Sequence, residues 1–211
     1  MDTLHWSPRS PYVRKVMVAI HEKGLTEQIE TVRTLADPMY PPQDFFATNP
    51  LAKIPTLERA GQPPIWDSRV LMEWADMQSE LGPCLFPADA NRIQALSDEA
   101  LGHGIIEVGV TLLIERNMRE AARQDPRVFD VCAAKFKSAL DYLEANAERL
   151  AARDFDAGHI SIGVALCYLD FRFDELAWRK SRPALAVLHD GLLERPSFKA
   201  TEFQDDPRPQ E

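Results

Sequence analysis

Residues 10–15 read Ser-Pro-Tyr-Val-Arg-Lys, and they predict the start of an amphipathic helix near the beginning of the chain. Ser10 is a favoured N-cap because its side-chain oxygen can accept a backbone N–H of the first turn, and Pro11 suits the first helical position. Apolar residues follow at helical spacing as far as Ile20. Residues 3–6 form a candidate strand before this helix, so the chain is predicted to open with a strand–helix unit.

Strand and helix signals continue to alternate up to residue 80. They predict a second strand at 29–32, a short helix around Phe45 and Phe46, a third strand at 54–57, and a minimal fourth strand at 65–66. An apolar helix follows, capped by Asp67 or Ser68. The predicted order is therefore βαβ, followed by α, β, β, α.

Beyond residue 90 the chain carries helical signals only. Residues 81–90 contain Gly82, Pro83 and Pro87, and they are the best linker candidate. Helices are predicted over 91–122 with a bend near Gly102 and Gly104, from Pro126 to Leu150, over 160–171, and from Pro183 to just before Pro196. We therefore predict a two-domain α+β/α architecture, with an α/β domain at 1–80 and an all-helical domain at 91–211.

Composition excludes several classes of function. The formal net charge of the 211 residues is −9, and there is no long basic run, so no nucleic-acid partner is expected. The three cysteines form no Cys-x-x-Cys pair, and the five histidines show no ligand spacing, so neither a disulfide framework nor a metal site is expected. No apolar stretch approaches the roughly 18 residues of a membrane span, and residues 1–10 lack the features of a signal peptide. A cytoplasmic protein without a membrane partner is predicted.

Ser10 has two interpretations. As a simple N-cap it satisfies one backbone N–H of its own helix. Alternatively, the same place suits a thiolate, because helix N–H groups and the helix dipole favour an anion there, and a hydroxyl can donate a hydrogen bond to a bound sulfur.

Residues 49–57 read Asn-Pro-Leu-Ala-Lys-Ile-Pro-Thr-Leu, with a proline at the start of the predicted third strand. Such a proline cannot donate to the sheet, and it needs an edge or a special role. A cis Ile54–Pro55 bond would leave the Ile54 N–H and C=O free to pair with a peptide-like ligand. The pair Asp67-Ser68 is at least an N-cap; it could also hold the ammonium and the carboxylate of an amino acid. Lys53 could meet a second carboxylate.

Taken together, these three motifs resemble the cytosolic glutathione transferases, the bacterial members especially. Residues 10–15 look like the family's Ser-Pro-x-x-Arg-Lys, residues 49–57 like its Asn-Pro-x-x-Lys-Val/Ile-Pro block, and 66–68 like its acidic-Ser pair. Residues 168–172 and 195–198 look like its C-terminal signatures. The resemblance implies a thioredoxin-like βαβαββα domain followed by a helical bundle, with glutathione as co-substrate and no metal.

The resemblance also implies a role for each motif residue. Ser10 would stabilise the glutathione thiolate, Ile54 with a cis Pro55 would bind the cysteinyl backbone, Asp67 and Ser68 would hold the γ-glutamyl end, and Lys53 would reach the glycine carboxylate. A homodimer acting in detoxification is implied, with a hydrophobic electrophile as second substrate. We expect that electrophile to meet Tyr12, His103, Ile106 and Val110.

One position departs from the family pattern. The buried sixth helix usually begins with Ser/Thr-x-x-Asp, whereas residues 156–159 here read Asp-Ala-Gly-His. Asp156 can still act as N-cap, but His159 in place of the acid is expected to weaken the cap. Two other functions stay open on the same scaffold: an inactive binding or regulatory protein, and a glutathione-dependent isomerase or peroxidase.

Overall fold

The computed structural model describes residues 1–206, which form two compact units. The first unit joins Met1–Pro87 to the segment that begins at Pro196, and the second spans Ala88–Arg195. The sequence prediction counted the segment after Pro196 with the helical domain. The structure instead groups it with the first unit, because its helix packs on the first helix of the chain.

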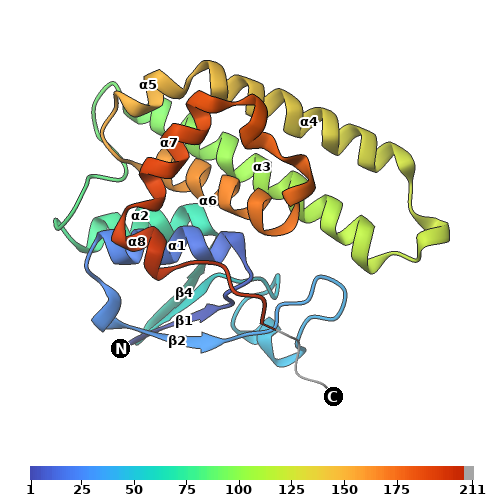
Figure 1. The fold of residues 1–211 in the computed structure, drawn as a ribbon. Coiled ribbons are helices and arrows are strands. Elements are labelled where there is room, and N and C mark those ends of the chain that lie inside the picture. Colours follow the sequence, from blue (N-terminus) through green and yellow to red (C-terminus); the bar gives the residue numbers. More distant parts are fainter. Residues whose placement is uncertain (207–211) are drawn as a thin grey trace. The chain divides into compact units, whose positions relative to one another are not determined.

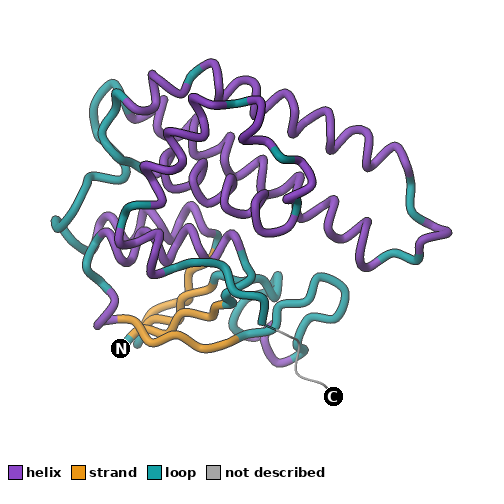
Figure 2. Tube along the Cα trace, viewed as in Figure 1, coloured by secondary structure: helices purple, strands orange, loops and turns teal. Residues whose placement is uncertain are grey.

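A four-stranded sheet forms the base of the first unit, and Figure 2 shows it in orange. The strands are β1 (Asp2–Trp6), β2 (Ile29–Arg33), β3 (Thr56–Arg59) and β4 (Gln62–Trp66), in the order β2-β1-β3-β4. Strand β1 pairs in parallel with β2 and antiparallel with β3, and β3 pairs antiparallel with β4. Leu4 and Leu57, which face each other across β1 and β3, are fully buried. The sheet therefore has an apolar centre, which its helices cover.

Two helices, α1 (Pro11–Glu22) and α2 (Ser68–Gln78), lie side by side on one face of this sheet (Figure 1). The short helix α8 (Pro196–Ala200) packs on α1. Two 3-10 helices, η1 (Thr26–Gln28) and η2 (Asp44–Ala47), complete the unit. This is the predicted βαβ, α, β, β, α order, with a 3-10 turn in place of the second helix, and it is a thioredoxin-like arrangement.

The second unit is entirely helical within the described residues. Its helices are α3 (Arg92–Met118), α4 (Pro126–Ala145), α5 (Ala147–Ala151), α6 (Ala157–Arg172) and α7 (Pro183–Leu193), with 3-10 turns η3 (Ala121–Arg123), η4 (Asp174–Leu176) and η5 (Trp178–Ser181). Helix α6 is buried along nearly its whole length, as predicted for a central helix. It lies so close to α3 that a Cβ atom on Gly102 would come within 2.4 Å of the Ser161 carbonyl carbon. Glycine at this position therefore permits the helix contact.

Several predicted boundaries differ from the observed ones. Helix α3 ends at Met118 and runs without a break through Gly102 and Gly104, and the helix predicted to reach Leu150 is divided at Asn146 into α4 and α5. Strand β3 begins at Thr56 rather than at residue 54, since the proline before it cannot donate to the ladder. Helix α8 was not predicted at all.

The N-terminus of α6 carries a capping box. The Asp156 carboxylate accepts the backbone N–H groups of Gly158 and His159 at 2.9 and 3.2 Å. His159 Nδ1 lies 3.1 Å from the Asp156 backbone nitrogen and 2.9 Å from Asp156 Oδ1, and its Nε2 lies 2.9 Å from the Leu150 carbonyl oxygen. His159 thus completes a capping box in the place of the usual acid. The weaker cap expected from this replacement stays a prediction, because the structure gives the contacts of the imidazole and not their free energy.

Candidate functional site

Ser10 is the N-cap of α1, as predicted. Its backbone is extended, with φ −86° and ψ 118°, and its hydroxyl oxygen accepts the Val13 N–H at 3.3 Å. The half-buried side chain uses only its acceptor capacity in this contact. A hydroxyl has one proton to donate in addition. The Ser10 O–H can therefore donate to an anion that binds at the N-terminus of this helix.

The loop before β3 is organised by Asn49, which is 1% exposed. Its amide Nδ2 donates to the Lys53 carbonyl oxygen and to Thr56 Oγ1, both at 2.9 Å, and its Oδ1 accepts the Leu51 N–H at 2.9 Å. Thr56 Oγ1 donates to the same Lys53 carbonyl at 2.7 Å. Ala52 takes a left-handed conformation, with φ 47°. These contacts fix the backbone that leads into Ile54.

Ile54 and Pro55 are joined by a cis peptide bond, as the motif resemblance implied. Within residues 1–206, no hydrogen bond of the protein engages the N–H or the C=O of Ile54, although the residue is only half-buried. Lys53 is exposed, and no described carboxylate pairs with it. This loop therefore offers one backbone donor, one backbone acceptor and one cation to a ligand.

Asp67 and Ser68 start helix α2. Asp67 is the N-cap: it adopts φ 75°, its Oδ1 accepts the Arg69 N–H at 2.8 Å, and its side chain is 45% exposed. Ser68 is 2% exposed, and its hydroxyl oxygen has no hydrogen-bond partner within the described part of the chain. An unsatisfied buried hydroxyl costs about 1–3 kcal/mol, so it is rare unless a ligand satisfies it.

Strand pairing brings these three loops to the same edge of the sheet. His5, near the end of β1, pairs with Thr56 at the start of β3, which in turn pairs with Trp66 at the end of β4. The loops that carry Ser10, Ile54 and Asp67 all leave from these positions. The residues predicted from separate motifs are therefore neighbours at one end of the sheet.

The electrostatics of this edge favour an anion. Helices α1 and α2 both begin here, and neither has an acidic residue in its first turn. The N-terminus of each helix carries about half a positive charge. Asp67 is the acidic group that the site adds, and it is suited to pair with an ammonium group.

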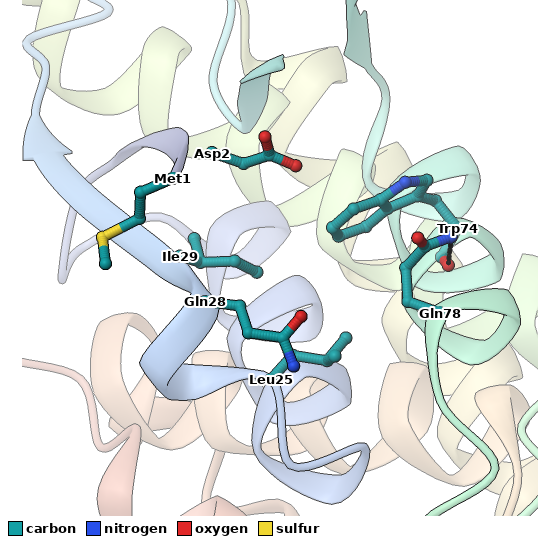
Figure 3. A pocket seen from close by; sticks show the side chains of 7 residues that line it. All are labelled: Met1, Asp2, Leu25, Gln28, Ile29, Trp74 and Gln78. Atoms are coloured by element: carbon teal, nitrogen blue, oxygen red, sulfur yellow. Dashed lines mark hydrogen bonds between the residues drawn. The ribbon is translucent and has the colours of Figure 1, made fainter. Parts of the chain in front are cut away.

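A hollow of about 190 Å³ lies at the opposite edge, where β1 begins. Its lining residues are Met1, Asp2, Leu25, Gln28, Ile29, Trp74 and Gln78 (Figure 3). In the close-up, the Trp74 indole and the Asp2 carboxylate stand on either side of the gap. None of the motif residues lines it, so this hollow is not the candidate site.

The four residues expected to meet a hydrophobic electrophile lie on two helices. Tyr12 is half-buried on α1, whereas His103 and Ile106 are buried on α3 and Val110 is half-buried there. His103 Nε2 lies 3.5 Å from the Glu107 carboxylate, one turn further along α3. Their part in a pocket stays a prediction.

Residues 1–206, which the structure describes, contain no group of three or more histidine, cysteine or acidic side chains arranged to hold a metal ion. None of the helices among them combines the length and the apolar character that crossing a membrane requires.

Sequence reasoning missed the residues that support the site. Asn49 was quoted as part of a motif without a role, and only its burial and its bonds to the 53–56 backbone reveal one. The sequence did contain one signal for this role. An Asn side chain that accepts the backbone N–H two residues later, as Asn49 does from Leu51, is typical of an Asx turn. The contacts of Arg14 with the C-terminal segment carried no local signal, because they join residues 184 positions apart.

Comparisons with known proteins agree with this geometry. The family described as "Glutathione S-transferase, N-terminal domain" matches residues 9–78. An Escherichia coli K12 protein named "Uncharacterized GST-like protein YibF" is 30% identical over 92% of this chain and 94% of its own length. A crystal structure of a glutathione transferase family member from Pseudomonas fluorescens Pf-5, with bound glutathione, has 36% identity and a TM-score of 0.92, covering 97% of this chain and 100% of that one.

The same Pseudomonas fluorescens Pf-5 family member has also been solved with bound S-(propanoic acid)-glutathione, with a TM-score of 0.89 at 36% identity and the same coverage of 97% and 100%. Motifs, fold, site geometry and relatives are therefore in agreement. The chain belongs to the glutathione S-transferase family.

Proposed function

We propose that this protein binds glutathione at the Ser10 edge of its first unit, ionises the thiol, and transfers the sulfur to a carbon atom of a hydrophobic electrophile. Glutathione acts as co-substrate, and no metal takes part. The proposal is built from the fit of this chain's own groups to the three residues of the tripeptide.

The observation that carries the proposal is the Ser68 hydroxyl, which is buried and unsatisfied at the N-terminus of α2. A γ-glutamyl carboxylate at this helix terminus would accept from the hydroxyl and from helix N–H groups. Asp67, the N-cap beside it, would pair with the γ-glutamyl ammonium. The γ-glutamyl group would thus provide a partner both for the buried Ser68 hydroxyl and for the exposed Asp67 carboxylate.

The free backbone groups of Ile54 support the next part of the fit. A cysteinyl residue in extended form would donate its N–H to the Ile54 C=O and accept from the Ile54 N–H, as in a short antiparallel pair. The exposed ammonium of Lys53 would reach the glycine carboxylate. The tripeptide would then run from α2 toward α1.

Ser10 would receive the sulfur. Lowering a thiol pKa by about two units from about 8.5 takes roughly 2.7 kcal/mol. One hydrogen bond to a charged acceptor and a helix N-terminus together supply an amount of this size. The thiol proton passes to solvent, and the thiolate forms the new carbon–sulfur bond by addition or by displacement of a leaving group.

The Pseudomonas fluorescens Pf-5 relative supports this reading, because it binds glutathione in one structure and an S-substituted glutathione in another. We further propose a cytoplasmic homodimer that acts in detoxification. Helix α2 has two exposed apolar side chains, Val70 at 51% and Met77 at 79%, which are available to a second subunit. The electrophile is proposed to meet Tyr12 on α1 and the residues of α3 named above.

The test is a comparison of wild type with Ser10→Ala, using Ser138→Ala at an exposed position of α4 as the matched hydroxyl deletion. Wild type saturated with glutathione should display the ultraviolet absorption of a thiolate near neutral pH, and Ser10→Ala should lose most of it together with turnover, while glutathione affinity stays within about threefold. A wild-type protein that is not retained on immobilised glutathione and conjugates no model electrophile would be a binding or regulatory protein. Retention with turnover of only peroxides or isomerisable substrates would assign the isomerase or peroxidase alternative.

A further inference from the structure

The segment 203–206, near the C-terminus, contacts the loop that leads into Ser10, and both belong to the first unit. The Gln204 N–H donates to the Pro8 carbonyl oxygen at 3.3 Å. The Arg9 side chain lies 3.2 Å from the Asp205 carboxylate and donates to the Asp206 carbonyl oxygen at 3.1 Å. The loop between β1 and α1 is therefore held from outside by residues almost two hundred positions away.

Arg14 connects the same segment to α1 itself. Its backbone N–H donates to the Ser10 carbonyl oxygen at 3.0 Å, so it lies one turn into the helix. The side chain is only 5% exposed. Its guanidinium carbon lies 4.6 Å from the centre of the Phe203 ring and 5.8 Å from that of Phe198, and it donates to the Phe198 carbonyl oxygen at 3.2 Å.

The charge of Arg14 has no opposite charge beside it in residues 1–206: none of the described carboxylates lies within ion-pair distance. Its Nε is buried without a partner as well. A buried cation without a counter-ion is unfavourable by itself, and here two aromatic rings and one carbonyl oxygen compensate it in part. No carboxylate among residues 1–206 neutralises the field of this charge, and the field adds to that of the positive end of α1.

We propose that residues 198–206 and Arg14 together position the thiol-activating end of α1: the segment keeps the 7–10 loop in place and holds the guanidinium of Arg14, a residue whose backbone lies one turn from Ser10. This inference rests on the proposed function. Arg14 does not touch the sulfur; it is a positioning residue whose unneutralised charge favours the thiolate over the thiol. The segment is required because a guanidinium released into water would be screened and would lose this effect.

The test measures the pKa of the glutathione thiol on the full-length protein, by ultraviolet titration of the thiolate. Arg14→Met should raise the pKa of the bound thiol by about one unit, so that turnover below that pKa falls about tenfold, while KM for glutathione changes less than about twofold. Arg14→Lys, which keeps the charge, should recover more than half of the shift. Phe203→Ala should raise the thiol pKa by a smaller amount.

Ser197→Ala is the matched control. Ser197 Oγ donates to the Glu22 carboxylate at 2.5 Å, which ties the start of helix α8, just before this segment, to the far end of α1. This variant should lose stability but keep the wild-type thiol pKa. Hydrogen exchange supplies a readout that is independent of activity: amides of residues 9–14 should exchange faster in Phe203→Ala than in Ser197→Ala.

The outcomes separate the two proposals. Folded Arg14→Met and Phe203→Ala proteins that titrate at the wild-type value would overturn this inference and leave the proposed function standing. Equal exchange in Phe203→Ala and Ser197→Ala would also overturn it. A wild-type protein without a bound thiolate would remove the proposed function and, with it, this inference. This inference would be supported if Arg14→Met recovers turnover at higher pH while Ser197→Ala keeps the wild-type thiol pKa.

Discussion

The ammonium of Lys23 lies 3.0 Å from the carboxylate of Asp76, and this ion pair joins the end of α1 to the end of α2. Both side chains are largely buried, at 3% and 12% exposed. The Asp76 carboxylate also accepts the backbone N–H groups of Leu85 and Phe86, each at 3.0 Å. One carboxylate therefore holds two helices and the chain that leaves them.

Asp76→Ala should destabilise the protein strongly. It leaves the buried Lys23 ammonium with the Pro83 carbonyl oxygen, at 3.0 Å, and it orphans two backbone N–H groups. Breaking a buried pair from one side costs about 3–5 kcal/mol, to be measured by urea unfolding. Glu80→Ala, at an exposed position, is the control and should stay within about 0.5 kcal/mol of wild type. A shift for Asp76→Ala as small as that of the control would show that the pair contributes nothing.

Ser68→Ala should separate binding from stability. Since the hydroxyl has no partner in the described chain, its removal should leave the free energy of unfolding unchanged or raise it by about 1 kcal/mol. Glutathione affinity should fall about tenfold, which corresponds to about 1.4 kcal/mol, measured by titration calorimetry. Ser138→Ala on the exposed face of α4 should change neither quantity. Wild-type affinity in Ser68→Ala would mean that the γ-glutamyl carboxylate binds elsewhere.

Asp67→Asn should weaken glutathione binding without loosening the fold. Asparagine keeps an oxygen for the Arg69 N–H and tolerates the φ of 75°, but it lacks the charge that would pair with an ammonium. We expect an affinity loss of about tenfold or more, and less than about 0.5 kcal/mol in stability. A glutathione analogue without the γ-glutamyl amino group is the matched probe, because it should bind wild type and Asp67→Asn equally. A stronger preference of this analogue for wild type would contradict the assignment.

Acid should destabilise the helical unit through two buried carboxyl groups. Burial by itself raises the pKa of Asp98 and of Asp156. Hydrogen bonds outweigh this effect of burial: Asp98 accepts from Arg149 and Arg153, and Asp156 accepts from His159 and Arg153. The pKa of each of these two carboxyl groups therefore lies below its usual value. A carboxyl group whose pKa is lower in the folded state stabilises the fold above its unfolded pKa, near 3.9, and this stability is lost as pH falls through the folded pKa.

The free energy of unfolding should accordingly fall steeply below about pH 4, as measured by urea transitions at several pH values. Asp156→Asn should be less stable at neutral pH and should show a shallower acid dependence, since it removes one of the two groups. Identical slopes for wild type and this variant would show that Asp156 does not take part in acid unfolding.

The parts of the structure that the sequence predicted are those decided locally. Ser10, Asp67 and Asp156 cap helices because each side chain bonds a backbone N–H two or three residues away, and such caps depend on neighbouring residues alone. The apolar run in α6 similarly predicts that this helix is buried, and the prediction needs no information about another segment. Two of these caps, Ser10 and Asp67, mark the helix starts that form the candidate site.

What the sequence could not provide depends on contacts between distant residues. Sheet register aligns three residues across three strands, namely His5, Thr56 and Trp66. No sequence motif predicts this alignment. The Arg14 environment is likewise created by a segment far along the chain. The walls of an electrophile pocket depend on helix packing in the same way, so the assignments on α3 rested on resemblance rather than on physical reasoning.

The discontinuity of the first unit affects how the protein is made. The ribosome must synthesise the whole of Ala88–Arg195 before Phe198 and Phe203 exist to receive Arg14. Domains that fold during synthesis normally complete in chain order, N-terminal first. Here the N-terminal unit cannot be completed in chain order, because helix α8 and Phe203 are synthesised only after the whole second unit, so Arg14 acquires its aromatic neighbours late in synthesis.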